Sequence, residues 1–230
     1  MKLQTLSGAL VALVLCMPAA AQNNELNWTM DRAVRQLDRQ GSDLESVLSE
    51  VDVEWTGAAQ DTDRIRSGRI YINERGEFRI SADMPKKRTI LKEGNSVHFY
   101  DPEAAKVDIY SLSRHKDRLE IYIPLGFTTT GKDLEDDFLV TFIGEETIGD
   151  RRTLGIELTP QRDDVRAVVA KIRIWFDQAS WLPARQEISN ASGGATLTVN
   201  YSGTARNLDL NPELFRDDWP RGTDKNQVRD

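Results

Sequence analysis

Apolar and polar residues alternate with a period of two over much of the first half of the chain. Each apolar pair places two side chains on one face of a strand; the pairs are Ile70/Ile72, Phe78/Ile80, Val97/Phe99 and Val107/Ile109. Turn-forming residues separate them, at Gly76, Pro85, Gly94-Asn95 and Asp101-Pro102. The pattern predicts an antiparallel meander with one buried face.

The same alternation returns in the second half of the chain. It predicts five more strands, at Phe138–Glu145, Thr153–Thr159, Ala170–Asp177, Ala184–Ser189 and Thr196–Ser202. We see no internal repeat, linker or low-complexity segment. The pattern therefore predicts one mainly β domain over residues 22–230, with a large antiparallel sheet of roughly eleven strands. Asn211–Phe215 resembles a capped turn, and the tail after Gly222 is expected to fray.

Helical spacing precedes the sheet. Asn24–Gln40 carries apolar residues near a 3.6-residue period, and Gly41 is expected to end this amphipathic helix. The next segment fits two patterns, because Leu44, Val47, Leu48 and Val51 are helix-spaced whereas Val51, Val53 and Trp55 alternate. We expect a strand from Val47 to Gly57.

The segment from Ser111 to Gly131 interrupts the strand pattern. Its apolar positions follow neither period, and Pro124 and Gly126 prevent a continuous helix. We expect a short helix followed by an irregular apolar loop, and then a helical turn at Lys132–Phe138. So apolar a segment must be buried, and the open mouth of the sheet is the nearest apolar surface. It is therefore predicted to be a lid, through Leu112, Leu119, Ile123, Leu125 and Phe127.

The N-terminus has the layout of a secretory signal peptide. Met1-Lys2 is positively charged, Leu6–Met17 is apolar but too short to span a bilayer, and Pro18–Ala21 ends in small residues. We expect cleavage after Ala21. Cys16 raises the alternative of a lipidated N-terminus, but a lipoprotein signal needs a small residue before the cysteine, and Leu15 is not small.

Composition excludes several classes of protein. The chain has 30 Lys+Arg against 37 Asp+Glu, a formal net charge of −7, and it lacks the basic surface that nucleic-acid binding requires. One cysteine excludes a disulfide framework and multi-cysteine metal sites. Two histidines leave little for a histidine-rich metal centre.

Motifs of catalysis are missing. The sequence has no metalloprotease, serine-hydrolase, dinucleotide-binding or P-loop signature. His98 lies between two apolar residues of a strand and is interpreted as a surface histidine on the outer face; His115 lies in a charged run. Glu135–Asp137 lacks the spacing of a calcium loop and is interpreted as a solvated helix face. Lys86–Arg88 is interpreted as a polar loop tip rather than a docking patch. These observations favour a binding or carrier protein that is not an enzyme and needs no cofactor or metal, over a secreted hydrolase.

Several short motifs resemble those of LolA-type periplasmic lipoprotein carriers when taken in order. The first half contributes Gly68–Ile80, Met84-Pro85, Gly94 and Val97–Pro102. The second half contributes Trp175–Asp177, Trp181–Pro183, Glu187, Gly193-Gly194, Asn207–Phe215 and Pro220–Gly222. The resemblance covers residues 47–222. In that family an arginine, usually beside a proline, helps to hold the lid; the matching positions here are Glu74-Arg75-Gly76, so Arg75 is the candidate.

The resemblance implies an unclosed, strongly curved β-barrel with an N-terminal helix and helical lid insertions over an apolar concave face. It implies a periplasmic protein of a Gram-negative cell, which takes lipoprotein acyl chains or other lipids from an inner-membrane ABC-type or other export complex to an outer-membrane acceptor. A lipid- or lipoprotein-sensing regulator on the same scaffold is the alternative. The predicted cavity residues are the inward-facing apolar ones: Val53, Trp55, Ile70, Ile72, Phe78, Ile80, Val97, Phe99, Val107, Ile109, Ile156, Leu158, Ile172, Ile174, Leu197 and Val199.

Overall fold

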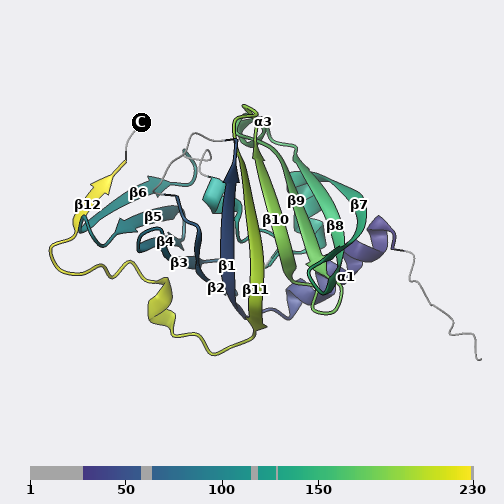
Figure 1. Cartoon of the computed structure of the whole chain (residues 1–230), viewed down its shortest axis with the longest axis horizontal. Helices are drawn as coiled ribbons and strands as arrows, with labels where there is room; N and C mark the ends of the chain where they lie inside the picture. Colours follow the sequence, from purple (N-terminus) through teal and green to yellow (C-terminus); the bar gives the residue numbers. More distant parts are fainter. Residues whose placement is uncertain (1–27, 58–63, 115–118, 128, 229–230) are drawn as a thin grey trace, which may run out of the picture.

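The structure is a computed structural model and describes residues 28–57, 64–114, 119–127 and 129–228 (Figure 1). The predicted signal peptide, Cys16, His115 and the start of the predicted first helix lie outside these ranges. Within them, no helix is long and apolar enough to cross a membrane.

Twelve strands form one sheet in the described part of the chain. The strands of the first half are β1 (Ser46–Thr56), β2 (Ser67–Asn73), β3 (Phe78–Met84), β4 (Arg88–Glu93), β5 (Ser96–Asp101) and β6 (Lys106–Ser111). Those of the second half are β7 (Phe138–Ile148), β8 (Arg151–Pro160), β9 (Val169–Asp177), β10 (Pro183–Asn190), β11 (Thr196–Arg206) and β12 (Asp224–Gln227). The helical segments are α1 (Met30–Ser42), η1 (Leu119–Tyr122), α2 (Gly131–Asp137), α3 (Asp163–Arg166) and η2 (Pro212–Phe215).

The sheet is curved and does not close into a barrel. Its strand order is β12-β6-β5-β4-β3-β2-β1-β11-β10-β9-β8-β7, so β12 and β7 are the two edges. The predicted fold class, mainly β with an unclosed half-barrel, is confirmed. All neighbouring strands are antiparallel except β12, which runs parallel to β6.

Register shifts help to bend the sheet. One lies in β1, between Leu48 and Glu50, and another in β2, between Ser67 and Gly68. At Gly68 the neighbouring strand approaches so closely that a Cβ would lie 2.3 Å from the carbonyl oxygen of Ser81. Only glycine fits at this point, and the bend therefore depends on it.

The first helix is shifted relative to its prediction. It begins at Met30, because the Thr29 side chain accepts a hydrogen bond from the Arg32 N–H at 3.4 Å and caps the first turn. It continues through Gly41 to Ser42, so the prediction that Gly41 ends it was wrong. Ala33 and Leu37 face the sheet and are buried.

The second helix was predicted as a helical turn and is confirmed as α2. Thr130 and Asp133 form a reciprocal capping box, in which Thr130 accepts from the Asp133 N–H at 3.1 Å. Leu134 is the residue that this helix buries against the sheet. The two helices α1 and α2 contact each other, and both cover the concave face.

The tail after Gly222 was predicted to fray, but it forms β12 at Asp224–Gln227 instead. Residues 207–228, here called the C-terminal strap, cross the outer face of β3 and β4 through η2 and end as β12 (Figure 1). The Arg79 guanidinium donates to the carbonyl oxygen of Leu214 at 3.2 Å, and Trp219 stacks on Tyr100 with ring centroids 4.7 Å apart. A strand at a sheet edge requires backbone hydrogen bonds but no apolar pattern, which explains why the sequence did not indicate it.

Candidate binding site

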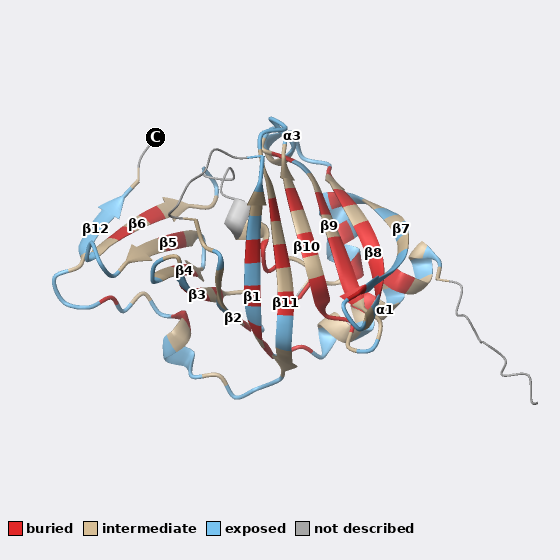
Figure 2. Cartoon of the chain, in the orientation of Figure 1, coloured by how far each residue is buried: buried red, intermediate tan, exposed pale blue. Residues whose placement is uncertain are grey.

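The concave face is a continuous apolar surface built by the register of the strands. Ile70 lies opposite Ile80, and Ile80 opposite Ile90. In the other half of the sheet Ile174 lies opposite Ile156. Each of these side chains is at most 2% exposed, and Figure 2 shows the corresponding buried bands crossing neighbouring strands.

Most of the predicted cavity residues lie together in this surface. The buried members are Val53, Ile70, Ile72, Phe78, Ile80, Val97, Ile156, Leu158, Ile172, Ile174, Leu197 and Val199, and Trp55 and Phe99 pack on them while partly exposed. These residues form one apolar cluster, which α1 and α2 cover.

Val107 and Ile109 do not belong to this surface. Val107 pairs with Tyr100, and Ile109 with His98, so both side chains lie on the opposite, convex face. There they form a second cluster with Leu91 and Trp219. The prediction that Val107 and Ile109 share one face of β6 is confirmed. Both faces of the sheet are apolar in this region, so the register of β6 with β5 decides which face these two side chains occupy.

His98 is also placed differently from its prediction. It does lie on the face opposite Val97, but it is only 5% exposed and is not a surface histidine. Trp219 of the C-terminal strap lies beside it, with ring centroids 6.0 Å apart. The covering residue comes from far along the chain, which a local pattern does not reveal.

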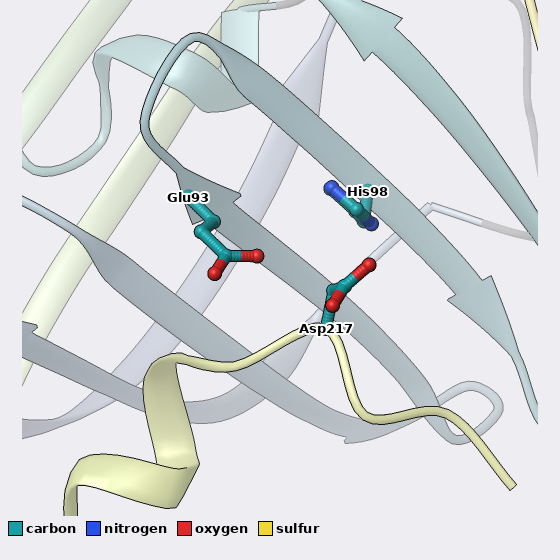
Figure 3. Close-up of side chains that lie close together, drawn as sticks. All are labelled: Glu93, His98 and Asp217. Atoms are coloured by element: carbon teal, nitrogen blue, oxygen red, sulfur yellow. The ribbon is translucent and has the colours of Figure 1, made fainter.

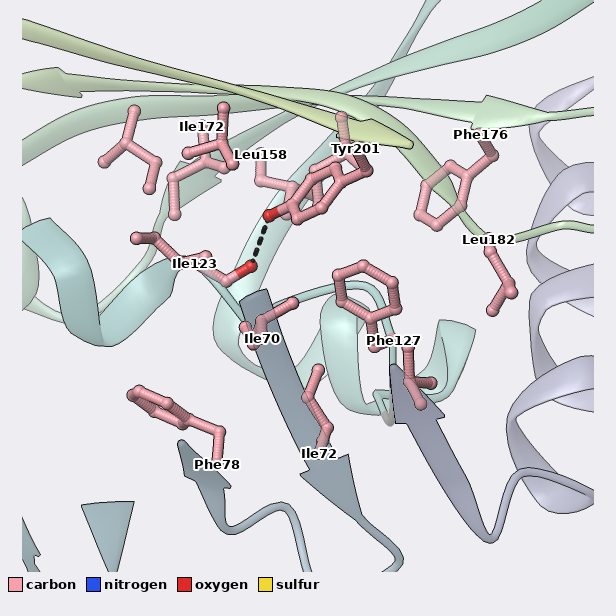
Figure 4. Packing of buried hydrophobic residues seen from close by; sticks show 14 of the residues in the cluster. Ile70, Ile72, Phe78, Ile123, Phe127, Leu158, Ile172, Phe176, Leu182 and Tyr201 are labelled. Atoms are coloured by element: carbon pink, nitrogen blue, oxygen red, sulfur yellow. Dashed lines mark hydrogen bonds between the residues drawn. The ribbon is translucent and has the colours of Figure 1, made fainter. Parts of the chain in front are cut away.

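The predicted lid lies in the concave face. The name lid segment is used here for residues 119–127. Ile123 and Phe127 are 3% and 2% exposed and belong to the same cluster as the strand residues, as Figure 4 shows. Leu125 and Leu112 pack against that cluster while partly exposed. Leu119 begins η1, and its side chain lies outside what the structure describes.

Gly126 brings the lid backbone into direct contact with the sheet. Its φ of +92° is a conformation that residues with a side chain rarely adopt. A Cβ at this position would lie 3.1 Å from Ile174 Cδ1 and 3.2 Å from Phe176 Cζ. The close approach thus requires glycine for both its backbone angle and its size.

Two polar side chains of the concave face hold the lid segment by its backbone. The Gln186 amide on β10 donates to the carbonyl oxygen of Tyr122 at 2.9 Å. The Tyr201 hydroxyl on β11 lies 2.8 Å from the carbonyl oxygen of Ile123 and 2.9 Å from Gln186 Oε1, so both oxygens share its single hydrogen (Figure 4). Both side chains are fully buried.

Burial determines the charge state of this polar pair. It raises the pKa of the Tyr201 hydroxyl well above its ordinary value. The hydroxyl therefore stays protonated and remains a donor at neutral pH. Phe127 packs edge-on against the same ring, with centroids 5.0 Å apart. Tyr201 accordingly contacts both the backbone and an apolar side chain of the lid.

Gln186 and Tyr201 were not among the predicted site residues, although the sequence carries a signal for them. Gln186 occupies the inward position between Ala184 and Ile188, and Tyr201 continues the inward series of Leu197 and Val199. A lone amide at an inward strand position requires a buried partner, and this requirement indicates a contact with another segment.

Arg75, the candidate lid-holding arginine, lies elsewhere. Its side chain is 69% exposed in the β2–β3 turn and pairs with Glu77 at 2.7 Å. Among the described residues, the lid segment is instead held by the two neutral side chains of β10 and β11.

One group of side chains could hold a metal ion in the described ranges. It consists of Glu93, His98 and Asp217, and it lies on the convex face rather than at the lid. In the described part of the chain the concave face offers apolar surface with neutral polar groups such as those of Gln186 and Tyr201, which suits an aliphatic ligand.

Comparisons with known proteins agree with this geometry. A family model described as "Outer membrane lipoprotein carrier protein LolA" matches residues 38–218. An outer-membrane lipoprotein carrier protein of Nitrosomonas europaea is 26% identical over 70% of this chain and 72% of its own. One of Nitrosospira multiformis is 25% identical over 69% and 70%. A crystal structure of an uncharacterized conserved protein from Thermus thermophilus shares the fold, with a TM-score of 0.55 at 10% identity over 87% of this chain and 100% of its own.

Proposed function

Because the chain belongs to the LolA family of outer membrane lipoprotein carrier proteins, we propose that it is a periplasmic carrier of lipoprotein acyl chains or related lipids. The acyl chains would occupy the apolar concave face. The observation that carries this proposal is the position of the lid segment, which covers the same surface that a lipid would need.

Competition between lid and lipid gives the proposed carrier two states. In the closed state Ile123 and Phe127 are buried, which contributes about 1.5–3 kcal/mol for each side chain. In the loaded state acyl chains replace them on the sheet. A ligand shifts such an equilibrium only by its differential affinity for the two states, so lid burial lowers the apparent affinity for lipid.

A lower affinity for lipid is useful to a carrier because acyl chains bind apolar surfaces very tightly. A three-chain anchor has roughly 45 methylene groups, and full burial at about 0.8 kcal/mol each would exceed about 35 kcal/mol. Reversible complexes reach only about 20 kcal/mol. A carrier that must release its cargo therefore needs a competing element, and the lid segment supplies one.

We further propose the route that the family name suggests. The signal peptide would direct residues 22–230 to the periplasm as one domain, an inner-membrane export complex would load it, and an outer-membrane acceptor would receive the lipid. A mature protein beginning at Gln22, found by mass spectrometry of the periplasmic fraction, would support this route. Acylation at Cys16 and retention in membranes would contradict it.

Lipid copurification tests the cargo. The protein purified from periplasm without detergent is expected to carry acyl lipid, detected by mass spectrometry, and added lipid is expected to raise its melting temperature by mass action. Ile72→Glu places a charge on the concave face and is expected to abolish both effects. Leu139→Glu is the matched control, because Leu139 is 62% exposed on β7.

The outcomes separate the alternatives. Lipid loss in both variants, or no shift of the melting temperature at saturating lipid, would contradict the carrier. Should Ile72→Glu fail to fold, the lipid titration of the unmodified protein decides alone. Lipid binding without transfer between inner- and outer-membrane vesicles would favour the sensing regulator.

A further inference from the structure

The C-terminal strap brings an acidic side chain onto the convex face beside a buried histidine. Trp219 anchors the strap, because it is 8% exposed and stacks on Tyr100. Two residues before it, Asp217 reaches the hairpin of β4 and β5. Glu93 at the end of β4 and His98 on β5 lie on the same face of that hairpin, and Figure 3 shows the three side chains converging.

The three side chains have the spacing of a set of metal ligands. One oxygen or nitrogen from each of Glu93, His98 and Asp217 lies within 4.8 Å of the others. Ligands of a tetrahedral Zn²⁺ ion lie about 3.3 Å apart, so small rotations of the two carboxylates would close the set. The Asp217 side chain is 49% exposed and has room for this movement.

His98 is the buried member of this set. The residue is 5% exposed, and its Nδ1 has no hydrogen-bond partner among the described residues. An unpaired buried nitrogen costs free energy, and one of the ring nitrogens lies toward the Asp217 carboxylate (Figure 3). A cation bound at Nδ1 would supply the partner that this nitrogen lacks among the described residues.

The charges around the histidine also favour a cation. The carboxylates of Glu93 and Asp217 lie beside the imidazole, and a cation between them would offset their mutual repulsion. A neutral imidazole has a lone pair on one ring nitrogen, and this is the form that binds a metal. Lys225 lies 3.8 Å from Asp217 and is the described cation that competes for this carboxylate.

We propose that Glu93, His98 and Asp217 bind a divalent transition-metal cation of the Zn²⁺ class, and that this cation fastens the C-terminal strap to the β4–β5 hairpin. Imidazole nitrogen and carboxylate oxygen are both ligands of Zn²⁺, and imidazole favours a transition metal over Mg²⁺ or Ca²⁺. Because Asp217 comes from the strap and the other two ligands from the sheet, the cation joins segments that are far apart in the sequence.

Titration of the metal-stripped, tag-free protein with ZnCl₂ tests the site. Calorimetry is expected to give one Zn²⁺ per chain, with a higher melting temperature. Hydrogen exchange in residues 207–228 is expected to slow on binding. The site does not depend on the lipid proposal, because its readout is metal binding in the absence of lipid.

Variants assign the ligands. Asp217→Asn is expected to weaken Zn²⁺ binding at least about tenfold, and Glu93→Gln similarly. Asp209→Asn is the matched control, because Asp209 is an exposed carboxylate of the strap outside the cluster. His98→Ala should abolish binding; if it fails to fold, Asp217→Asn decides. No heat with ZnCl₂, or unchanged affinity in Asp217→Asn, would overturn the proposal.

Discussion

The hydroxyl of Tyr201 lies 2.8 Å from the carbonyl oxygen of Ile123, which joins the middle of the sheet to the backbone of the lid segment. The contact is fully buried, and Gln186 completes it by holding the preceding residue of the lid. A backbone carbonyl as the acceptor makes the contact independent of the lid's side chains. The closed position of the lid therefore depends on two strand residues.

Tyr201→Phe should loosen the lid. The change leaves the oxygens of Ile123 and Gln186 without their donor inside an apolar cluster, and we expect the free energy of unfolding to fall by about 1–3 kcal/mol. Denaturant unfolding measures this. Tyr71→Phe is the control, since it removes a hydroxyl from a half-buried tyrosine of the convex face. If the two changes lowered the free energy of unfolding equally, the buried hydrogen bonds of Tyr201 would contribute no more than a half-buried hydroxyl does.

Lipid binding should change the amide hydrogen exchange of the lid segment and of the sheet in opposite directions. If acyl chains displace the lid segment, amide hydrogens in residues 119–127 should exchange faster in the loaded protein, while those of β2 and β5 around Ile72 and Phe99 become more protected. Hydrogen exchange followed by mass spectrometry measures both. Unchanged exchange in the lid segment would identify a static plug of the core.

Gly126→Ala should destabilise the protein more than Gly193→Ala. Both glycines have positive φ angles, +92° and +71°, so both substitutions are strained by roughly 1–2 kcal/mol. Only at Gly126 would the added Cβ also press on Ile174 and Phe176; at Gly193 nothing lies within 4 Å. The difference between the two unfolding free energies therefore measures the packing of the lid. A difference near zero would show that the lid moves aside at no cost.

Glu157 should stabilise the sheet at neutral pH and lose this effect in acid. Arg173 donates to it at 2.8 Å, and this hydrogen bond, with a second from Lys171, lowers the Glu157 pKa below its ordinary value of 4.5. A lowered pKa stabilises the fold above the unfolded value and ceases to do so as the pH falls through the folded one. Glu157→Gln should cost about 1 kcal/mol or less at pH 7. The gap between the two proteins should close in acid; a constant gap from pH 7 to 3 would contradict the assignment.

Most of the strands were predictable because the period of two is local; β4 was not, since its neighbouring residues Ile90 and Leu91 are both buried and do not alternate. The sequence also indicated the lid, since Pro124, Gly126 and their apolar neighbours cannot form regular structure and need to be buried. The alternating pattern does not predict the register between neighbouring strands. Val107 and Ile109 were assigned to the concave face for this reason, and Tyr100 and His98 across the hairpin place them on the other.

Burial by a segment distant in the sequence was the other feature that could not be predicted. Trp219 of the C-terminal strap packs beside His98, which is 5% exposed. The strap ends in Asp224–Gln227, which has no apolar residue, and it pairs with β6 through backbone hydrogen bonds and one side-chain hydrogen bond, from Asn226 to Asp108 at 2.7 Å. No local pattern marks such a strand. For Gln186 the inward position could be predicted from the alternation on β10. Its hydrogen-bond partner, the backbone of the lid segment, could not.

The place of β1 in the sheet has a consequence for the order of folding. β1 is near the middle of the sheet, between β2, which follows it directly in the chain, and β11, which follows only after the nine strands β2–β10. Strands β2 to β6 can pair through short connections as they emerge, and β1 can pair with β2, but the other edge of β1 stays open until β11 arrives. Closing so long a loop is slow, and an unpaired strand edge favours aggregation. We therefore expect a chain cut short before β11 to aggregate, with the edge of β1 as the point of contact.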